Sequence, residues 1–204
     1  MLSSSITVIT PAESYDLTTI NSVKAELGIS DNSEDEHLYR WIRQASGVIA
    51  DYCNRVFAEE TLEETFRSAT NADTLVLARC PIVSIASIVE NGVALAEADY
   101  EIASASGTLI RLCDDTRTCW PTGKIVVTFT AGYALLGDLP YGVERAAITL
   151  VSQYRHDAGR NPNIRSESTD GLGSTSWFDG AGSRGGLPPE VVGLLQSFQT
   201  PAFG

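Results

Sequence analysis

Histidine and basic residues are scarce in this chain, and both shortages limit what it can do. The only histidines are His37 and His156, and neither has a cysteine or another histidine at the spacing of zinc ligands. The chain has 14 Lys and Arg residues against 26 Asp and Glu residues, a formal net charge of −12. Such an acidic surface repels phosphate groups. We therefore expect no metal site and no tight binding of nucleic acid.

Long hydrophobic runs and paired cysteine motifs are also missing. No stretch approaches the roughly 18 apolar residues that span a bilayer, and the first ten residues lack the basic and apolar regions of a signal peptide. We expect neither a membrane span nor a signal peptide. Cys53, Cys80, Cys113 and Cys119 contain no Cys-x-x-Cys spacing. We interpret them as reduced, buried hydrophobic residues of a protein folded in a cytosol, with a Cys113–Cys119 disulfide as the less favoured alternative.

The remaining composition is typical of a folded globular protein. Hydrophobic residues make up 43% of the chain and charged residues 20%, and its 204 residues suit one medium domain or a domain with an insertion.

Helical periodicity characterises the first part of the chain after an extended or frayed N-terminal arm, residues 1–16. Apolar spacing predicts a helix from about Thr18 to Leu27, with Gly28 as its left-handed C-terminal residue. Ser33 and Glu36 predict a capping box at the start of a longer helix, which should end near Asn54.

The hydrophobic period changes from 3.6 to 2 between about residues 60 and 133. Strands are indicated by β-branched and aromatic residues, and Asn91-Gly92 is a strong hairpin signal. We predict five to six short antiparallel strands in this region.

Helical signals return after Pro140, which opens a helix running through Tyr154. Residues 157–186 are rich in glycine and serine and predict a long loop. Pro188-Pro189 then begins a last helix with an apolar face. That face has the anchor pattern of a helix in a groove, so we predict a partner-binding surface, with packing on its own core as the alternative. The predicted partner-binding residues are Leu187, Val191, Leu194, Leu195, Phe198 and Phe203.

These segments predict an α+β fold with three parts. A helical bundle, residues 17–57 and 139–204, forms the core and carries the Gly/Ser-rich loop before its C-terminal helix. An antiparallel β region, residues 58–138, is inserted into it, and residues 1–16 form the arm.

No motif predicts catalysis, a cofactor or a metal. Asp31, Ser33 and Asp35 imitate the start of a calcium loop, but the required glycine is replaced by Glu36. A match to Gly-x-Gly-x-x-Gly at residues 180–185 follows no strand, so a flexible loop explains it better. We expect both histidines to lie on the surface.

Two further clusters also have a simple structural interpretation. Glu59, Glu60, Glu63 and Glu64 are more typical of a solvated strand edge than of a paired-carboxylate site. Tyr39, Trp41 and Tyr52 recur at helical spacing, which favours core packing over stacking of a ligand.

An ordered set of short motifs resembles the phage head–tail connector, or head–tail adaptor, family in its long form. The motifs are Val23-Lys24-Ala25-Glu26-Leu27-Gly28-Ile29, Ile49-x-x-Tyr52-Cys53-Asn54-Arg55, Pro81-Ile82-x-Ser84-Ile85, Asn91-Gly92, Asp99-Tyr100, Thr128-x-Thr130-Ala131-Gly132-Tyr133, Leu139-Pro140, Arg165-Ser166-Glu167-Ser168 and Leu187-Pro188. Together they extend over nearly the whole chain.

This resemblance implies a non-enzymatic structural protein of the virion neck, assembled in the bacterial host cytoplasm. It implies a homo-oligomeric ring, a dodecamer, below the portal protein and above a stopper or tail protein. DNA would pass through the ring without specific binding.

Two alternatives stay open. The first is another neck component, a head-closure stopper or a tail terminator, although these are β-rich and lack two N-terminal helices. A small ligand-binding or hydrolytic domain built on the β region is the alternative from another class.

Overall fold

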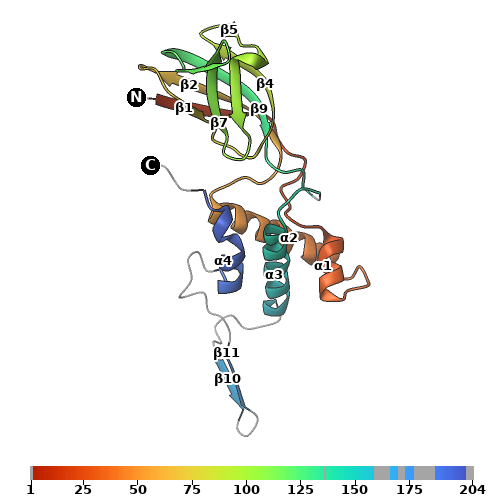
Figure 1. The fold of residues 1–204 in the computed structure, drawn as a ribbon. Coiled ribbons are helices and arrows are strands. Elements are labelled where there is room, and N and C mark those ends of the chain that lie inside the picture. Colours follow the sequence, from red (N-terminus) through yellow and green to blue (C-terminus); the bar gives the residue numbers. More distant parts are fainter. Residues whose placement is uncertain (1, 136, 159–165, 170–172, 177–186, 201–204) are drawn as a thin grey trace. The chain divides into compact units, whose positions relative to one another are not determined.

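The computed structural model describes residues 2–135, 137–158, 166–169, 173–176 and 187–200. The chain forms two compact units, each made from two separate stretches (Figure 1). The β unit contains Met1–Ser14 and Val56–Ala134, and the helical unit contains Tyr15–Arg55 and Leu135–Gly204. The predicted mixture of helices with antiparallel sheets is confirmed.

The β unit contains two antiparallel sheets. Its strands are β1 (Leu2–Thr10), β2 (Glu60–Ser68), β3 (Leu75–Val76), β4 (Ile82–Glu90), β5 (Val93–Ala94), β6 (Tyr100–Ala103), β7 (Thr108–Cys113), β8 (Thr116–Thr118) and β9 (Gly123–Ala131). One sheet has the order β1-β2-β9-β4-β5, and the other has the order β3-β7-β6 with β8 also paired to β7. The prediction of five to six strands was too low because β3, β5 and β8 are only two or three residues long.

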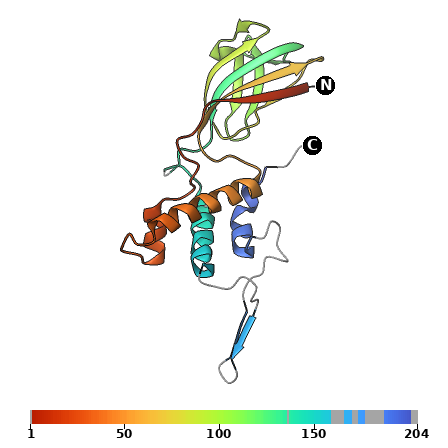
Figure 2. The same ribbon diagram turned by 180° about the vertical axis from the view of Figure 1, so that it is seen from behind.

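The N-terminal segment belongs to this unit as a strand. We expected residues 1–16 to be an extended or frayed arm, but Leu2–Thr10 pairs antiparallel with β2 along its length. The alternation of Leu2, Ile6 and Val8 with serine and threonine is the period-2 signal of a strand. Strand β1 lies at the edge of its sheet beside β2 (Figures 1 and 2).

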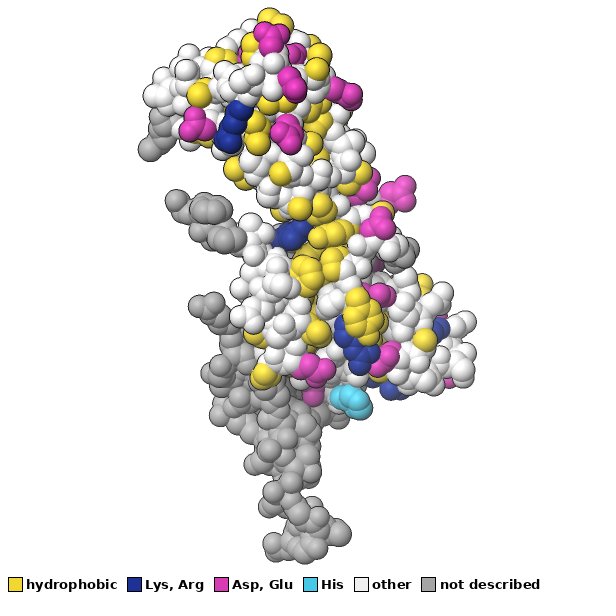
Figure 3. Space-filling model, viewed as in Figure 1, with side chains coloured by type: hydrophobic (Ala, Val, Ile, Leu, Met, Phe, Trp, Pro, Cys, Tyr) yellow, Lys and Arg dark blue, Asp and Glu magenta, His cyan; other side chains and the backbone are white. Residues whose placement is uncertain are grey.

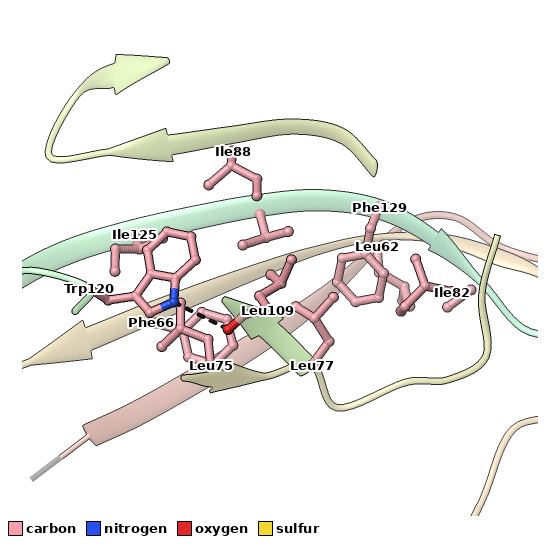
Figure 4. Packing of buried hydrophobic residues seen from close by; sticks show 12 residues of the cluster. Leu62, Phe66, Leu75, Leu77, Ile82, Ile88, Leu109, Trp120, Ile125 and Phe129 are labelled. Atoms are coloured by element: carbon pink, nitrogen blue, oxygen red, sulfur yellow. Dashed lines mark hydrogen bonds between the residues drawn. The ribbon is translucent and has the colours of Figure 1, made fainter. Parts of the chain in front are cut away.

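The core of the β unit lies between its two sheets. Trp120 is fully buried, and its indole Nε1–H donates to the backbone oxygen of Leu109 at 3.3 Å (Figure 4). That bond satisfies the polar end of an otherwise apolar side chain. The other buried members of this cluster are Leu62, Phe66, Leu75, Leu77, Ile82, Ile88, Ile125, Val127, Phe129 and Ala131.

Two glycines explain turns in the β unit. Asn91 and Gly92 join β4 to β5 with φ of 49° and 89°, so the predicted Asn-Gly hairpin is confirmed. Gly132 has φ of 119°, and a Cβ there would stand 2.3 Å from the backbone oxygen of Ala58. Only glycine permits the chain leaving β9 to approach Ala58 so closely.

The helical unit is organised around α3. Its helices are α1 (Ile20–Leu27), α2 (Asp35–Cys53), α3 (Tyr141–Asp157) and α4 (Pro189–Leu195), and the 3-10 turn η3 (Gln196–Phe198) follows α4. Helix α3 packs against α1, α2 and α4, and it runs beside α4 in both views (Figures 1 and 2). The description of these helices as a bundle stays a prediction.

The helix ends differ partly from expectation. Gly28 ends α1 with φ of 67°, and Asn54 ends α2 with φ of 48°, as predicted. The predicted capping box of Ser33 and Glu36 was wrong, because α2 begins after Glu34 without a side-chain cap. The Ser33 N–H and hydroxyl instead donate to Asp31 Oδ1 at 2.9 and 2.6 Å, forming a local turn.

Part of the predicted Gly/Ser-rich loop lies outside the described residues. Within residues 157–186, β10 (Ser166–Thr169) and β11 (Gly173–Ser176) form an antiparallel pair. Residues 159–165, 170–172 and 177–186, which include the glycine motif, are not described. A loop along the whole segment is therefore wrong for residues 166–169 and 173–176, and for the residues that are not described it stays a prediction.

Candidate interaction surfaces

Histidines and clusters of acidic or thiol side chains are the groups that would catalyse a reaction or hold a metal ion. Both histidines are exposed, as predicted, and the His37 ring lies 5.7 Å from that of Trp41. Within the described ranges, no three His, Cys, Asp or Glu side chains are grouped to hold a metal ion. In the same ranges, no helix has the length and apolar character of a bilayer span.

The four cysteines are reduced, but only one is fully buried. Cys53 lies in the helical core, where burial raises its pKa to about 11. The expectation of buried cysteines was wrong for Cys113 and Cys119, which flank the β8 hairpin and are exposed. Cys119 donates to Asp73 Oδ1 at 3.3 Å, and this hydrogen bond to a carboxylate raises its pKa. The thiols therefore differ strongly in access to solvent.

The acidic cluster on β2 is not a solvated strand edge. Strand β2 lies between β1 and β9, and Glu60 and Glu64 are only 5% and 1% exposed. The prediction of a solvated strand edge was wrong because β1, and not β2, is the edge strand of this sheet. Burial raises the pKa of Glu64, and hydrogen bonds from Ala78 N–H and the Ser4 side chain partly oppose that rise. Glu64 is thus a buried structural carboxyl inside the β unit.

The aromatic residues of α2 pack less deeply than predicted. Tyr39 is 50% exposed, so the core-packing interpretation was wrong for it. Trp41 is half-buried and lines a shallow pocket with His37, Glu34, Arg155 and His156. The Arg155 guanidinium donates to both carboxylate oxygens of Glu34 at 2.8 and 3.0 Å and lowers the pKa of that carboxyl. This ion pair between Glu34 and Arg155 joins the start of α2 to α3. The packing of these two helices therefore accounts for the pocket.

A second pocket lies between α1, α3 and the start of α4. Arg145 Nη1 and Glu26 Oε1 form an ion pair of 2.7 Å there, and Ile148, Thr149 and Pro188 contribute to the lining. Ser152 and His156 also line this pocket, and Thr149 Oγ1 donates to the backbone oxygen of Arg145 at 2.9 Å.

The predicted partner-binding residues divide into two groups. Leu187, Val191 and Leu195 are 2%, 0% and 0% exposed, because α4 packs on α3. Leu194 and Phe198 are half-buried and keep part of their surface accessible. Phe203 lies outside the described residues. Among the predicted partner-binding residues that the structure describes, Leu194 and Phe198 are therefore the two with surface that a partner could contact.

A second apolar surface was not anticipated from the sequence. Strand β1 has no charged residue, and four of its large side chains are exposed. These are Leu2 at 41%, Ile6 at 40%, Val8 at 44% and Ile9 at 55%. The visible face of the β unit elsewhere carries acidic side chains and few basic ones (Figure 3). The sequence signal for this exposed strand is the alternation of apolar and polar residues in β1, a segment that we expected to be an arm.

Comparison with solved structures identifies the same fold in particle necks. A chain from the neck of an empty gene transfer agent particle with C6 symmetry is 17% identical, with a TM-score of 0.58, and the match covers 98% of this chain and 97% of that chain. A chain from the neck of the native particle with C12 symmetry is 16% identical, with a TM-score of 0.59 and the same coverage. Both matches show a shared fold across the two units.

Comparison with curated protein sequences found no significant match. The sequence profile of the head completion protein family, in contrast, matches residues 16–200, which is most of the chain. This agrees with the resemblance to phage head–tail adaptors seen in the sequence motifs. The chain belongs to the head completion protein family and is a structural phage protein, not an enzyme.

Proposed function

We propose that this chain is the subunit of a homo-oligomeric ring in the neck of a tailed phage or a phage-like particle. The ring lies below the portal protein, extends the DNA channel and binds the stopper or tail protein that follows. The observation that carries the proposal is family membership over residues 16–200, supported by a fold shared with neck chains along both units. Assembly takes place in the host cytoplasm.

The charge of the chain suits a channel wall. Its net charge of −12 repels the phosphates of DNA, so DNA slides past without being held. The ring has twelve copies in this proposal, in keeping with the C12 symmetry of the neck of the native gene transfer agent particle.

The partly exposed surface of Leu194 on α4 and Phe198 on η3 is the proposed contact with the portal. Both side chains are partly accessible, whereas Leu187, Val191 and Leu195 anchor the helix to its own core. Phe203 supplies a further aromatic anchor in this proposal. The five described residues share one apolar face, so in this proposal α4 stays anchored to its own core while Leu194 and Phe198 keep part of their surface accessible.

Complementation of defective particles tests the proposal. Particles made without this protein should contain DNA-filled heads that lack tails, and adding the purified wild-type protein should restore tail joining. Normal tailed particles in the absence of the protein would rule out a neck role.

A further inference from the structure

The free edge of β1 is unusual for a soluble protein. It is nine residues long, lacks charge and proline, and belongs to a chain whose net charge is −12. Soluble proteins normally protect such an edge with charged side chains, proline, bulges or a covering element, because its unpaired N–H and C=O groups recruit other strands. In β1 the only irregularity of register lies at its far end, between Val8 and Thr10.

The side chains of β1 are also left uncovered on the core side of the sheet. Ile6 pairs with Glu64, and Val8 pairs with Leu62, so each pair shares a face. Glu64 and Leu62 are each 1% exposed, whereas Ile6 and Val8 are 40% and 44% exposed. The apolar face of the sheet therefore extends onto Ile6 and Val8, where the described part of the chain covers it only in part.

The opposite edge of the same sheet has a matching gap. Strand β5 pairs only with Val89 and Glu90 at the end of β4. Ile82 N–H donates to the backbone oxygen of Ser104 at 2.8 Å, and the Ile88 oxygen accepts from Leu95 N–H at 2.9 Å. Between these contacts, no other described strand pairs with residues 83–87 on the side away from β9. This run is uncharged, and Val83 is 55% exposed.

Two different free edges on one sheet suit a head-to-tail contact between copies. Such a contact uses a different surface on each partner and can close into a ring, whereas pairing of β1 with itself would stop at a dimer. Both edges lack charge, so two acidic copies can meet there without opposed like charges. A second copy is therefore the occupant that fits both edges at once.

We propose that β1 of one subunit pairs with residues 83–87 on β4 of the adjacent copy, joining the sheets around the ring. The inference rests on the proposed ring and adds the surface that closes it. Pairing satisfies the outer backbone groups of at most five residues of β1, because the β4 edge is occupied by Ser104 and Leu95 at either end of residues 83–87, and it covers part of Ile6 and Val8.

Inter-subunit cross-linking tests this pairing in assembled particles. Cysteine at Ser5 is combined in turn with cysteine at Ser84, Ala86 or Ser87, all exposed in the single chain. Opposite Cα atoms of neighbouring strands lie about 4.5–5.5 Å apart, within the range of a disulfide. Cys113→Ser and Cys119→Ser remove the two exposed native thiols from every variant.

The pairing predicts a ladder of species larger than a dimer on non-reducing gels for at least one combination. Absence of any cross-link, with the protein present in the particles, overturns the edge pairing and leaves the neck function intact. A dimer formed by Ser5→Cys alone overturns it in favour of β1 pairing with itself. If the protein is absent from purified particles, the proposed function fails and the pairing with it.

A charge placed on the edge gives an independent test. Ile6→Lys should prevent incorporation into particles while the isolated subunit keeps its fold, because the lysine stem can lie along the surface that isoleucine covers. Val76→Lys is the matched control, since Val76 on β3 is an exposed aliphatic residue at 58%. Equal incorporation of the two variants contradicts the proposal.

Discussion

The backbone N–H of Ala78 donates to Oε2 of Glu64 at 2.9 Å inside the β unit. The carboxyl is 1% exposed, and its burial raises its pKa above the ordinary 4.5. A carboxyl with a raised pKa in the folded state holds its proton more tightly there than in the unfolded chain. Its contribution to stability is therefore complete below pH 4.5 and decreases as the pH rises towards the raised pKa.

Glu64→Gln should remove this pH dependence, because glutamine keeps an acceptor for Ala78 without an ionisable proton. The free energy of unfolding of the variant, relative to wild type, should increase as the pH rises from 4.5. Chemical denaturation between pH 4 and 8 measures it. Glu64→Leu, which removes the acceptor, should cost about 1–3 kcal/mol. Parallel pH profiles for Glu64→Gln and wild type would show that Glu64 does not titrate with a raised pKa.

The buried and the half-buried residues of α4 should respond differently to substitution. Leu195→Ala should lower the free energy of unfolding by about 2–5 kcal/mol, because Leu195 is 0% exposed. Leu194→Asp should reduce incorporation into portal-bearing heads while the isolated subunit still folds, because Leu194 is only half-buried. Gln196→Asp, at an exposed neighbouring position, is the control for added charge. If Leu194→Asp subunits join heads as well as the control, α4 does not bind the portal.

The thiols should react in an order set by exposure. Cys113 is exposed and should react first with a maleimide at neutral pH, followed by Cys119, whose pKa is raised by its bond to Asp73. Cys53 is buried and has a pKa of about 11, so it should react only after unfolding. Mass spectrometry of peptides labelled over time gives the order, and early labelling of Cys53 would be inconsistent with its buried position.

The isolated protein should bind DNA weakly at physiological salt. Its net charge of −12 gives no surplus of cations to replace the counterions of the phosphates. Fluorescence anisotropy with a labelled duplex, measured at several salt concentrations, checks this. Tight binding that weakens steeply with added salt would argue against a channel wall that DNA passes freely.

Local signals in the sequence predicted much of the fold because their physical causes are local. Gly28 and Asn91-Gly92 adopt left-handed conformations at the predicted helix end and hairpin. The acidic pattern on β2 was misread because burial of Glu64 depends on pairing with β1, more than fifty residues earlier in the chain. Periodicity shows that a strand has two faces, but it does not show which strand lies beside it.

The interaction surfaces were predictable only in part for the same reason. The apolar face of the last helix was visible in the sequence, but packing on α3 decides that Val191 and Leu195 point inwards. The exposed face of β1 became recognisable only when the sheet order placed this strand at an edge.

A symmetric reconstruction of the neck from native particles would locate this chain in the particle. We predict a closed ring of this chain directly below the portal, with DNA or an open channel along its axis. A neck without this chain, or the chain located at another position in the particle, would show that it is not the ring subunit below the portal.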